Sequence, residues 1–351
     1  MRRPLSILIL MLALAVLCAP GARAADEPVF RAELIFDDIP GYPSHHGSTI
    51  EELDTGELMA AWYSGAAEKA TDVAIFASFM PADRSAWTAP VVLHDTPDLS
   101  DGNPVLFQAP DHRLWLYYVT IEGASWNDCP IRSKFSMDHG RTWSEPRFVR
   151  EKKQWMTRNK PIVLSDGRIL LPLYDERVFQ SHFYISEDNG ETWRDQGMIK
   201  QFQTLQPTVI ERADGALYCM MRTGASNSDI WESLSKSNGE KWTPARQSGM
   251  PNPGAAVDMV KLANGHVALA FNNSYSGRNP LSVALSTDEG RTWSHIRNIE
   301  ADDSGSYSYP AIIQDSTGII HVTYTWNRKS IKHAAFNEAW IMQGAEKPAQ
   351  K

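Results

Sequence analysis

Cysteine is scarce in this 351-residue chain, which contains three: Cys18, Cys129 and Cys219. Cys18 lies in an apolar stretch near the start, and the two others are too few for a disulfide framework. Positive charge is also in short supply, because 34 lysines and arginines stand against 42 aspartates and glutamates, a formal net charge of -8. This acidic balance argues against a nucleic-acid partner.

Long hydrophobic runs are lacking beyond the start of the chain. Residues 1–3 read MRR, residues 5–17 are mostly apolar, and residues 22–24 read ARA, a pattern typical of a cleavage site. This order predicts a secretory signal peptide over residues 1–24, and hence an exported protein in a periplasm or outside the cell. The apolar run is too short for a typical membrane span, and no later run replaces it.

An amphipathic helical period of useful length is also missing, and a repeated octet is found instead. Residues 286–293 read STDEGRTW, and close copies lie at residues 136–143 and 186–193, with a worn copy at residues 235–242. The octet is typical of a hairpin turn. Its Asp accepts local backbone N–H bonds, its Gly supplies a positive φ, and its Trp begins the next strand.

A second repeat, a tight turn followed by a mostly apolar strand, occurs six times. The turns lie at residues 54–58, 111–114, 166–169, 214–217, 264–267 and 317–320. Six units of about fifty residues, each with room for four short strands, predict an all-β fold, a six-bladed β-propeller.

The ends of the chain complete this prediction. Residues 30–36 precede the first turn, so we expect them to pair with the last blade, at residues 331–336, and close the ring. The predicted organisation is a signal peptide at residues 1–24, one propeller domain at residues 25–343 and a disordered tail at residues 344–351.

Function is expected away from the octets, because such turns lie on the outside of a propeller and stabilise its blades. Polar residues at the ends of the inner strands converge on one mouth of the channel. The candidates are His45, Glu68, Asp72, Asn103, Arg158, Glu176, Gln206, Arg222, Asp258, Arg278, Tyr307, Tyr309 and Arg328. The doublet His45-His46 has no further His or Cys at ligand spacing, so no catalytic metal and no cofactor are predicted, while a structural calcium ion stays open.

The octets, the six-unit layout and the local motifs resemble the sialidase (neuraminidase) superfamily, especially its sialidase-like proteins with BNR (Asp-box) repeats. The resemblance covers nearly the whole chain after the signal peptide. It implies that Tyr307, in the segment SYSYP at residues 306–310, matches the tyrosine nucleophile. A neutral tyrosine suits a sugar whose anomeric carbon carries a carboxylate. Arg222 and Arg278 match two of the family's three arginines, which clamp that carboxylate.

Three positions depart from the family pattern. His45 occupies the place of the first arginine, and Gln206 that of the glutamate that polarises the tyrosine. Glutamine cannot take a proton from tyrosine, whose reference pKa is near 10. The general-acid aspartate has no clean match, and the equivalent loop offers Glu68 and Asp72.

Other residues of the mouth are candidates for the missing roles. Arg158 is a candidate third cation, and Asp258 or Glu176 a candidate base or second carboxylate. Tyr309 is expected to stack on a sugar ring or to fill the channel wall, and Arg328 to line the site.

The leading hypothesis is an exported glycoside hydrolase of sialidase type, which removes a terminal acidic sugar such as sialic acid or a related ulosonic or uronic acid. Tyr307 would attack or stabilise the anomeric centre, and Glu68 or Asp72 would protonate the leaving oxygen. Two alternatives stay open. The replacements at His45 and Gln206 favour a non-catalytic carbohydrate-binding propeller, and the third possibility is a lyase acting on acidic polysaccharides.

Overall fold

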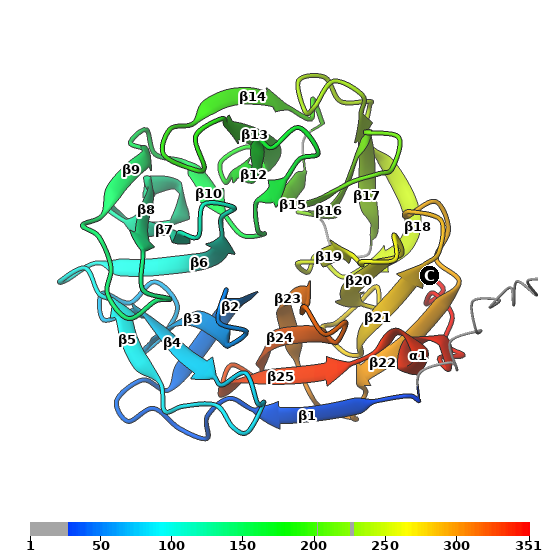
Figure 1. Ribbon diagram of the computed structural model, residues 1–351, viewed down its shortest axis with the longest axis horizontal. Coiled ribbons are helices and arrows are strands. Elements are labelled where there is room, and N and C mark those ends of the chain that lie inside the picture. Colours follow the sequence, from blue (N-terminus) through cyan, green and yellow to red (C-terminus); the bar gives the residue numbers. More distant parts are fainter. Residues whose placement is uncertain (1–26, 202, 225–227) are drawn as a thin grey trace, which may run out of the picture.

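Six antiparallel sheets stand around a central axis in the computed structural model, which describes residues 27–201, 203–224 and 228–351 (Figure 1). The predicted six-bladed, all-β propeller is confirmed. The predicted signal peptide lies outside the described residues. Within the described part, no helix is long and apolar enough to cross a membrane. Cys129 and Cys219 are buried free thiols.

The first three blades begin with the strands closest to the axis. The first blade contains β2 (Ser44–Glu52), β3 (Leu58–Gly65), β4 (Ala74–Met80) and β5 (Val91–His94). The second contains β6 (Ser100–Gln108), β7 (Leu114–Ile121), β8 (Ile131–Ser136) and β9 (Arg147–Arg150), with a short 3-10 helix at Trp126–Asp128 after β7. The third contains β10 (Trp155–Thr157), β11 (Ile162–Val163), β12 (Ile169–Asp175), β13 (Gln180–Ser186) and β14 (Arg194–Met198).

The last three blades follow the same order. The fourth contains β15 (Thr204–Glu211), β16 (Leu217–Thr223), β17 (Ser228–Ser235) and β18 (Arg246–Asn252). The fifth contains β19 (Asp258–Lys261), β20 (Val267–Asn272), β21 (Leu281–Ser286) and β22 (His295–Glu300). The sixth contains β23 (Tyr307–Gln314), β24 (Ile320–Trp326) and β25 (Ser330–Phe336), and the helix α1 (Glu338–Met342) follows it.

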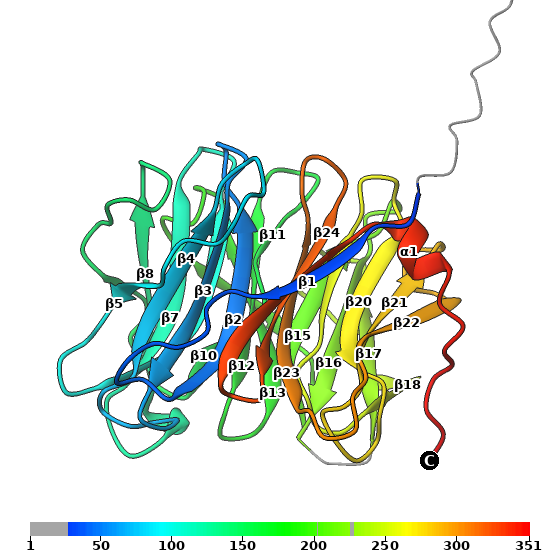
Figure 2. The same ribbon diagram turned by 90° about the horizontal axis from the view of Figure 1, so that it is seen from below.

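The ring is closed by a strand from the other end of the chain. β1 (Phe30–Leu34) pairs antiparallel with β25, with Phe30 opposite Phe336, and becomes the outermost strand of the sixth blade (Figure 2). This confirms the predicted closure. The first and last parts of the chain thus share one sheet, so the propeller has no open seam between its ends.

The octets form compact turns held by their own side chains. In residues 286–293, Ser286 Oγ donates to Asp288 Oδ1 at 2.7 Å and accepts from the Gly290 N–H at 2.7 Å. The Asp288 carboxylate also accepts from the N–H and the hydroxyl of Thr292, both at 2.7 Å. Gly290 has a φ of 80°, and a Cβ there would lie 2.5 Å from the ring of Tyr218 in the preceding blade. Only glycine fits this turn.

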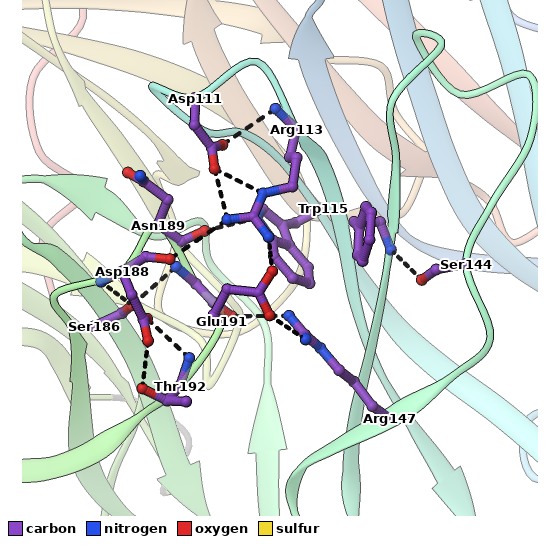
Figure 3. A network of polar contacts seen from close by, with 12 residues as sticks. Asp111, Arg113, Trp115, Ser144, Arg147, Ser186, Asp188, Asn189, Glu191 and Thr192 are labelled. Carbon is purple, nitrogen blue, oxygen red and sulfur yellow. Dashed lines mark hydrogen bonds and ion pairs between the residues drawn. The ribbon is translucent and has the colours of Figure 1, made fainter.

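The octets also connect neighbouring blades. In Figure 3, Glu191 of the third blade lies between Arg113 and Arg147 of the second and forms an ion pair with each. The indole N–H of Trp115 donates to the carbonyl of Asn189 at 2.9 Å. These contacts hold outer turns against the adjacent blade, in agreement with a structural role for the octets.

The tail at residues 344–351, predicted to be disordered, instead contacts the fourth and fifth blades. The Asn273 side chain donates to the carbonyl of Lys347 at 2.8 Å and accepts from the N–H of Ala349 at 2.8 Å. Lys351 lies 3.7 Å from the carboxylate of Asp229. The tail is polar, and these partners lie far away in the sequence, so its composition alone did not reveal them.

Candidate functional site

One mouth of the central channel contains a cavity of about 220 Å³. The inner strands begin at this mouth and the second strands of the blades end at it, so residues from all six blades reach it. The charged residues in its wall are Glu68, Glu176, Arg222, Arg278 and Arg328, and the main aromatic ones are His46, Tyr63, Trp126, Tyr174 and Tyr309.

The inner strands share an irregularity at this mouth. The pairing register shifts near the start of β2, β6, β15 and β23. At these bulges the φ angles are positive, at 66° for Gly47, 46° for Asn103, 55° for Gln206 and 53° for Tyr309. The left-handed conformation costs a residue with a side chain on the order of 1–2 kcal/mol. Such strain is often concentrated at functional sites, and three of these four residues line the cavity.

Tyr309, and not Tyr307, is the tyrosine of the sixth blade that lines the cavity. Tyr307 is fully buried between the fifth and sixth blades, its ring lies against that of Tyr324, and its hydroxyl donates to the carboxylate of Asp302. The expectation that Tyr307 faces the mouth is therefore wrong. The bulge between Ser308 and Ala311 explains the difference, because it changes which side chain of the strand turns inward.

In the first blade, too, the residue expected at the cavity is next to the one that lines it. His45 is buried away from the cavity, where its Nδ1 lies 2.8 Å from Ser64 Oγ and its ring meets Phe36 edge-on. His46 lines the cavity instead, because adjacent residues of a strand point to opposite faces. Burial, together with four nearby arginines, holds the pKa of His46 well below its usual value. The imidazole that replaces an expected arginine is therefore neutral.

Arg222 and Arg278 are cations without a matching anion. Within the described residues, neither forms an ion pair, whereas Arg328 lies 2.8 Å from the carboxylate of Glu68. Arg222 donates to Gln206 Oε1 at 3.3 Å, and its buried Nε has no hydrogen-bond partner among the described residues. Burial, opposed by Tyr309 and reinforced by Arg222 and Arg328, lowers the pKa of Arg278. Two unpaired guanidinium groups in one cavity favour an anionic ligand.

Arg158 lies beneath the site. Its guanidinium is 4.9 Å from the ring of Tyr309 and donates to the carbonyls of Ser48 at 3.1 Å and Pro310 at 2.8 Å. It is 3% exposed and is not among the residues that line the cavity. Arg158 therefore packs beneath the ring of Tyr309. It does not supply the third cation at the mouth that the sequence suggested.

Gln206 connects three residues of the wall. Its Oε1 accepts from Arg222, which fixes the amide so that Nε2 donates to the hydroxyl oxygens of Tyr174 at 3.3 Å and Tyr309 at 3.4 Å. A glutamate at this position would accept the phenolic proton of Tyr309. The glutamine donates to the same oxygen instead, which reverses the direction of the hydrogen bond.

The four predicted carboxylates are separated by the fold. Glu68 lines the cavity, with Trp126 Nε1 donating to it at 3.1 Å. Glu176 also lines it. Asp72 accepts from the N–H of Ala66 at 3.0 Å and closes its own loop outside the cavity. Asp258 lies in the channel beyond, where it accepts from Thr208 at 2.8 Å and from the N–H of Ile312 at 3.0 Å. Catalytic roles for Asp72 and Asp258 therefore do not fit this geometry.

Asp258 belongs to a larger cavity of about 640 Å³ toward the opposite mouth. The polar groups there are largely paired with one another. Lys160 lies 3.3 Å from Asp258, and Glu211 accepts from the N–H and the hydroxyl of Ser165. This cavity lacks the unpaired cations of the smaller one, so the smaller cavity is the better candidate site.

The profile of the BNR repeat-like domain family matches residues 56–322, which is most of the chain. The chain belongs to this family. The BNR repeats are the octets described above, and the match extends from the first blade into the sixth.

Curated relatives of this BNR protein are sialidases. The anhydrosialidase of Macrobdella decora is 25% identical over 252 residues, which cover 65% of this chain and 32% of that protein. The sialidase of Bacteroides fragilis is 26% identical over 221 residues, which cover 57% of this chain and 40% of that protein. The chain is thus sialidase-like, and it spans well under half the length of these two relatives.

Solved structures show the same fold at low identity. A protein of unknown function from Dyadobacter fermentans has a TM-score of 0.76 at 16% identity, over 88% of this chain and 99% of that chain. The intramolecular trans-sialidase of Ruminococcus gnavus, in complex with oseltamivir carboxylate, has a TM-score of 0.72 at 14% identity, over 85% of this chain and 95% of that chain. At such identities the likeness establishes the fold of the BNR propeller alone.

Several residues that line the cavity of this BNR protein could not be predicted from the sequence. Tyr63 and Tyr174 lie near the ends of apolar strands, where a tyrosine is indistinguishable from a core residue. Trp126 comes from a loop of the second blade and covers Gly102, where a Cβ would lie 2.7 Å from its ring. A glycine in a strand is a sign of such close approach, but it does not say which residue approaches.

Proposed function

We propose that the cavity binds a terminal acidic sugar of a glycan and that the protein hydrolyses the glycosidic bond in the manner of a sialidase. The observation that carries this proposal is the pair Arg222 and Arg278, which lack an anionic partner within the described residues and lie beside Tyr309. The sialidase-like family membership supports the same reading. Sialic acid or a related ulosonic or uronic acid fits this description.

The chain's own residues supply the main parts of the reaction. Arg222 and Arg278 bind the carboxylate of the sugar with forked, charge-assisted hydrogen bonds. Tyr309 takes the role expected of Tyr307 and stabilises the positive charge that develops at the anomeric carbon, with Gln206 and Arg158 holding its phenol in place. A phenol suits this role because an anionic side chain would be repelled by a carboxylate on the same carbon.

The test is release of sugar from a panel of sialosides and uronosides by the purified protein and by two variants. Tyr309→Phe is expected to lower kcat at least 100-fold, because the stabilising oxygen is lost. Tyr307→Phe is the matched control, since it removes a hydroxyl of the same strand that donates to Asp302 and does not line the cavity. If no member of the panel is cleaved, the hydrolase proposal fails. Full activity in Tyr309→Phe overturns the role assigned to Tyr309.

A non-catalytic carbohydrate-binding role is the second candidate. It is favoured by Gln206, which donates to Tyr309 where a carboxylate would accept its proton. Binding without turnover is then expected, with saturation by free sialic acid or glucuronic acid and loss of binding in Arg222→Ala. Turnover of any glycoside in the panel that depends on Tyr309 rules this candidate out.

A further inference from the structure

Two carboxylates lie in the wall of the same cavity in different surroundings. Glu68 meets the guanidinium of Arg328 at 2.8 Å and the indole N–H of Trp126 at 3.1 Å. Both partners favour the charged carboxylate. Glu176, in contrast, forms no ion pair within the described part of the chain, and the neutral hydroxyl of Tyr174 is among the neighbouring groups that act on its pKa.

Glu176 is held by a well-fixed turn after β12. Its N–H donates to the carbonyl of Gln154 at 2.8 Å. The preceding Asp175 accepts from the N–H groups of Arg177 at 2.9 Å and Val178 at 3.2 Å. These bonds fix the backbone on both sides of Glu176, so the carboxyl is presented to the cavity by a rigid support.

The orientation of Gln206 determines how the hydroxyl of Tyr174, a neighbour of Glu176, is hydrogen-bonded. Because Arg222 fixes the amide, Gln206 Nε2 donates to the hydroxyl oxygen of Tyr174. That oxygen is an acceptor in this contact, so the proton of Tyr174 is free to point to Glu176. Glu176 thus has a neutral phenol as a neighbour and, within the described residues, forms no ion pair, while Arg222 acts on it from a greater distance.

Burial in the cavity wall favours retention of a proton on Glu176. Burial raises the pKa of Glu176 to about 7, with Arg222 and the Tyr174 hydroxyl opposing the rise and Glu68 and Asp175 adding to it. A carboxyl that titrates near neutral pH is suited to proton transfer.

We propose that Glu176 is the general acid of the site, an assignment that rests on the proposed glycosidase function. Its carboxyl proton passes to the glycosidic oxygen as the bond from that oxygen to the anomeric carbon breaks, and the bonding electron pair leaves with the oxygen. The resulting carboxylate then takes a proton from the water that attacks the anomeric carbon. Glu176 is thereby restored, and the products are the free acidic sugar and the released alcohol.

The test compares leaving groups in Glu176→Gln. The substrate pairs are 4-nitrophenyl α-sialoside with 3′-sialyllactose, and 4-nitrophenyl β-glucuronide with methyl β-glucuronide. A nitrophenol leaves without a proton, whereas a sugar or methyl alcohol needs one. Glu176→Gln is expected to lower kcat/KM for the alcohol glycoside by about 10²–10⁴-fold and for the nitrophenyl glycoside by less than about 10-fold.

The pH profile gives a second readout. With the alcohol glycoside, kcat/KM of the unaltered protein is expected to fall as the pH rises through about 7, because the acid must carry its proton. Glu176→Gln removes this limb. Glu68→Gln is the matched control. It is expected to lower kcat/KM for both substrates of a pair by similar factors and to keep the fall in kcat/KM as the pH rises through about 7.

The outcomes separate the two proposals. Retained cleavage of the nitrophenyl glycoside by Glu176→Gln shows that this variant is folded. Equal losses on both leaving groups, or an unchanged pH limb, overturn the assignment of Glu176 and leave the hydrolase function standing. If the unaltered protein cleaves neither pair, the proposed function fails, and the assignment fails with it.

Discussion

Arg222 and Arg278 carry the charge recognition of the site. A charge-assisted hydrogen bond contributes about 1.5–3 kcal/mol, so Arg222→Ala is expected to weaken binding of sialic acid by about 10- to 100-fold. The neutral methyl ester of the sugar should bind the unaltered protein and the variant with similar affinity. Titration calorimetry with the acid and the ester measures the difference.

The matched control for this prediction is Arg246→Ala. Its side chain is 78% exposed and lies 2.7 Å from Glu232, outside the cavity. No change in affinity is expected there, because exposed ion pairs contribute little. Loss of binding to acid and ester alike in Arg222→Ala would contradict carboxylate recognition.

At the residue scale, sequence patterns located the site to within one or two positions. Arg222, Gln206, Arg278 and Arg328 line the cavity as the ends of apolar strands indicated. His46 and Tyr309 do so in place of His45 and Tyr307. The choice between such neighbours depends on bulges in the inner strands, which result from pairing with distant residues and leave no local sequence signal.

At the scale of elements, the octet turns are expected to contribute stability and no chemistry. Asp288→Ala removes an acceptor for Ser286, Arg291 and Thr292. Because the turn is at the surface, the expected loss is about 1 kcal/mol in the free energy of unfolding. Urea unfolding measures it, and sugar binding should be unchanged.

Glu187→Ala is the control for this octet prediction. Its side chain is 65% exposed and meets Arg194 at 3.1 Å, so a change near zero is expected. A loss in Asp288→Ala no larger than in Glu187→Ala would contradict the role of the octet aspartate. The octets were predictable because each is a local turn whose donors and acceptors lie within eight residues.

At the scale of the whole molecule, the ring closes through a buried hydrogen-bonded chain. Trp87 of the first blade donates to His333 Nδ1 at 3.3 Å, His333 Nε2 lies 2.9 Å from His321 Nδ1, and His321 Nε2 lies 3.0 Å from Asp315. Arg84 also donates to Asp315, at 2.8 Å. The closure by β1 was predictable from the leftover strand. This hydrogen-bonded network was not, because it joins the sixth blade to residues of the first blade that are more than 200 positions away.

The ring nitrogens of His321 and His333 already have hydrogen-bond partners, so an added proton on either ring would be poorly placed. Burial lowers the pKa of His333 to about 4, although Glu33 opposes the shift, and burial also lowers the pKa of His321. Glu33 lies 3.7 Å from His333 Nδ1 and is the nearest anion there. An unfolded histidine titrates near 6.5, so between about pH 6.5 and 4 the unfolded chain binds more protons than the folded one.

The free energy of unfolding is therefore expected to fall as the pH drops from about 6.5 toward 4, where the folded His333 begins to accept a proton. His333→Gln removes one titrating group from this window, so its stability should fall less steeply with acid than that of the unaltered protein. Urea unfolding at pH 7, 5.5 and 4.5 measures both slopes. His112→Gln is the control, because that side chain is 79% exposed and lies far from the closure. Equal slopes for His333→Gln and the unaltered protein would contradict this prediction. They would show that His333 does not contribute to the loss of stability in acid, since the other buried histidines are common to both.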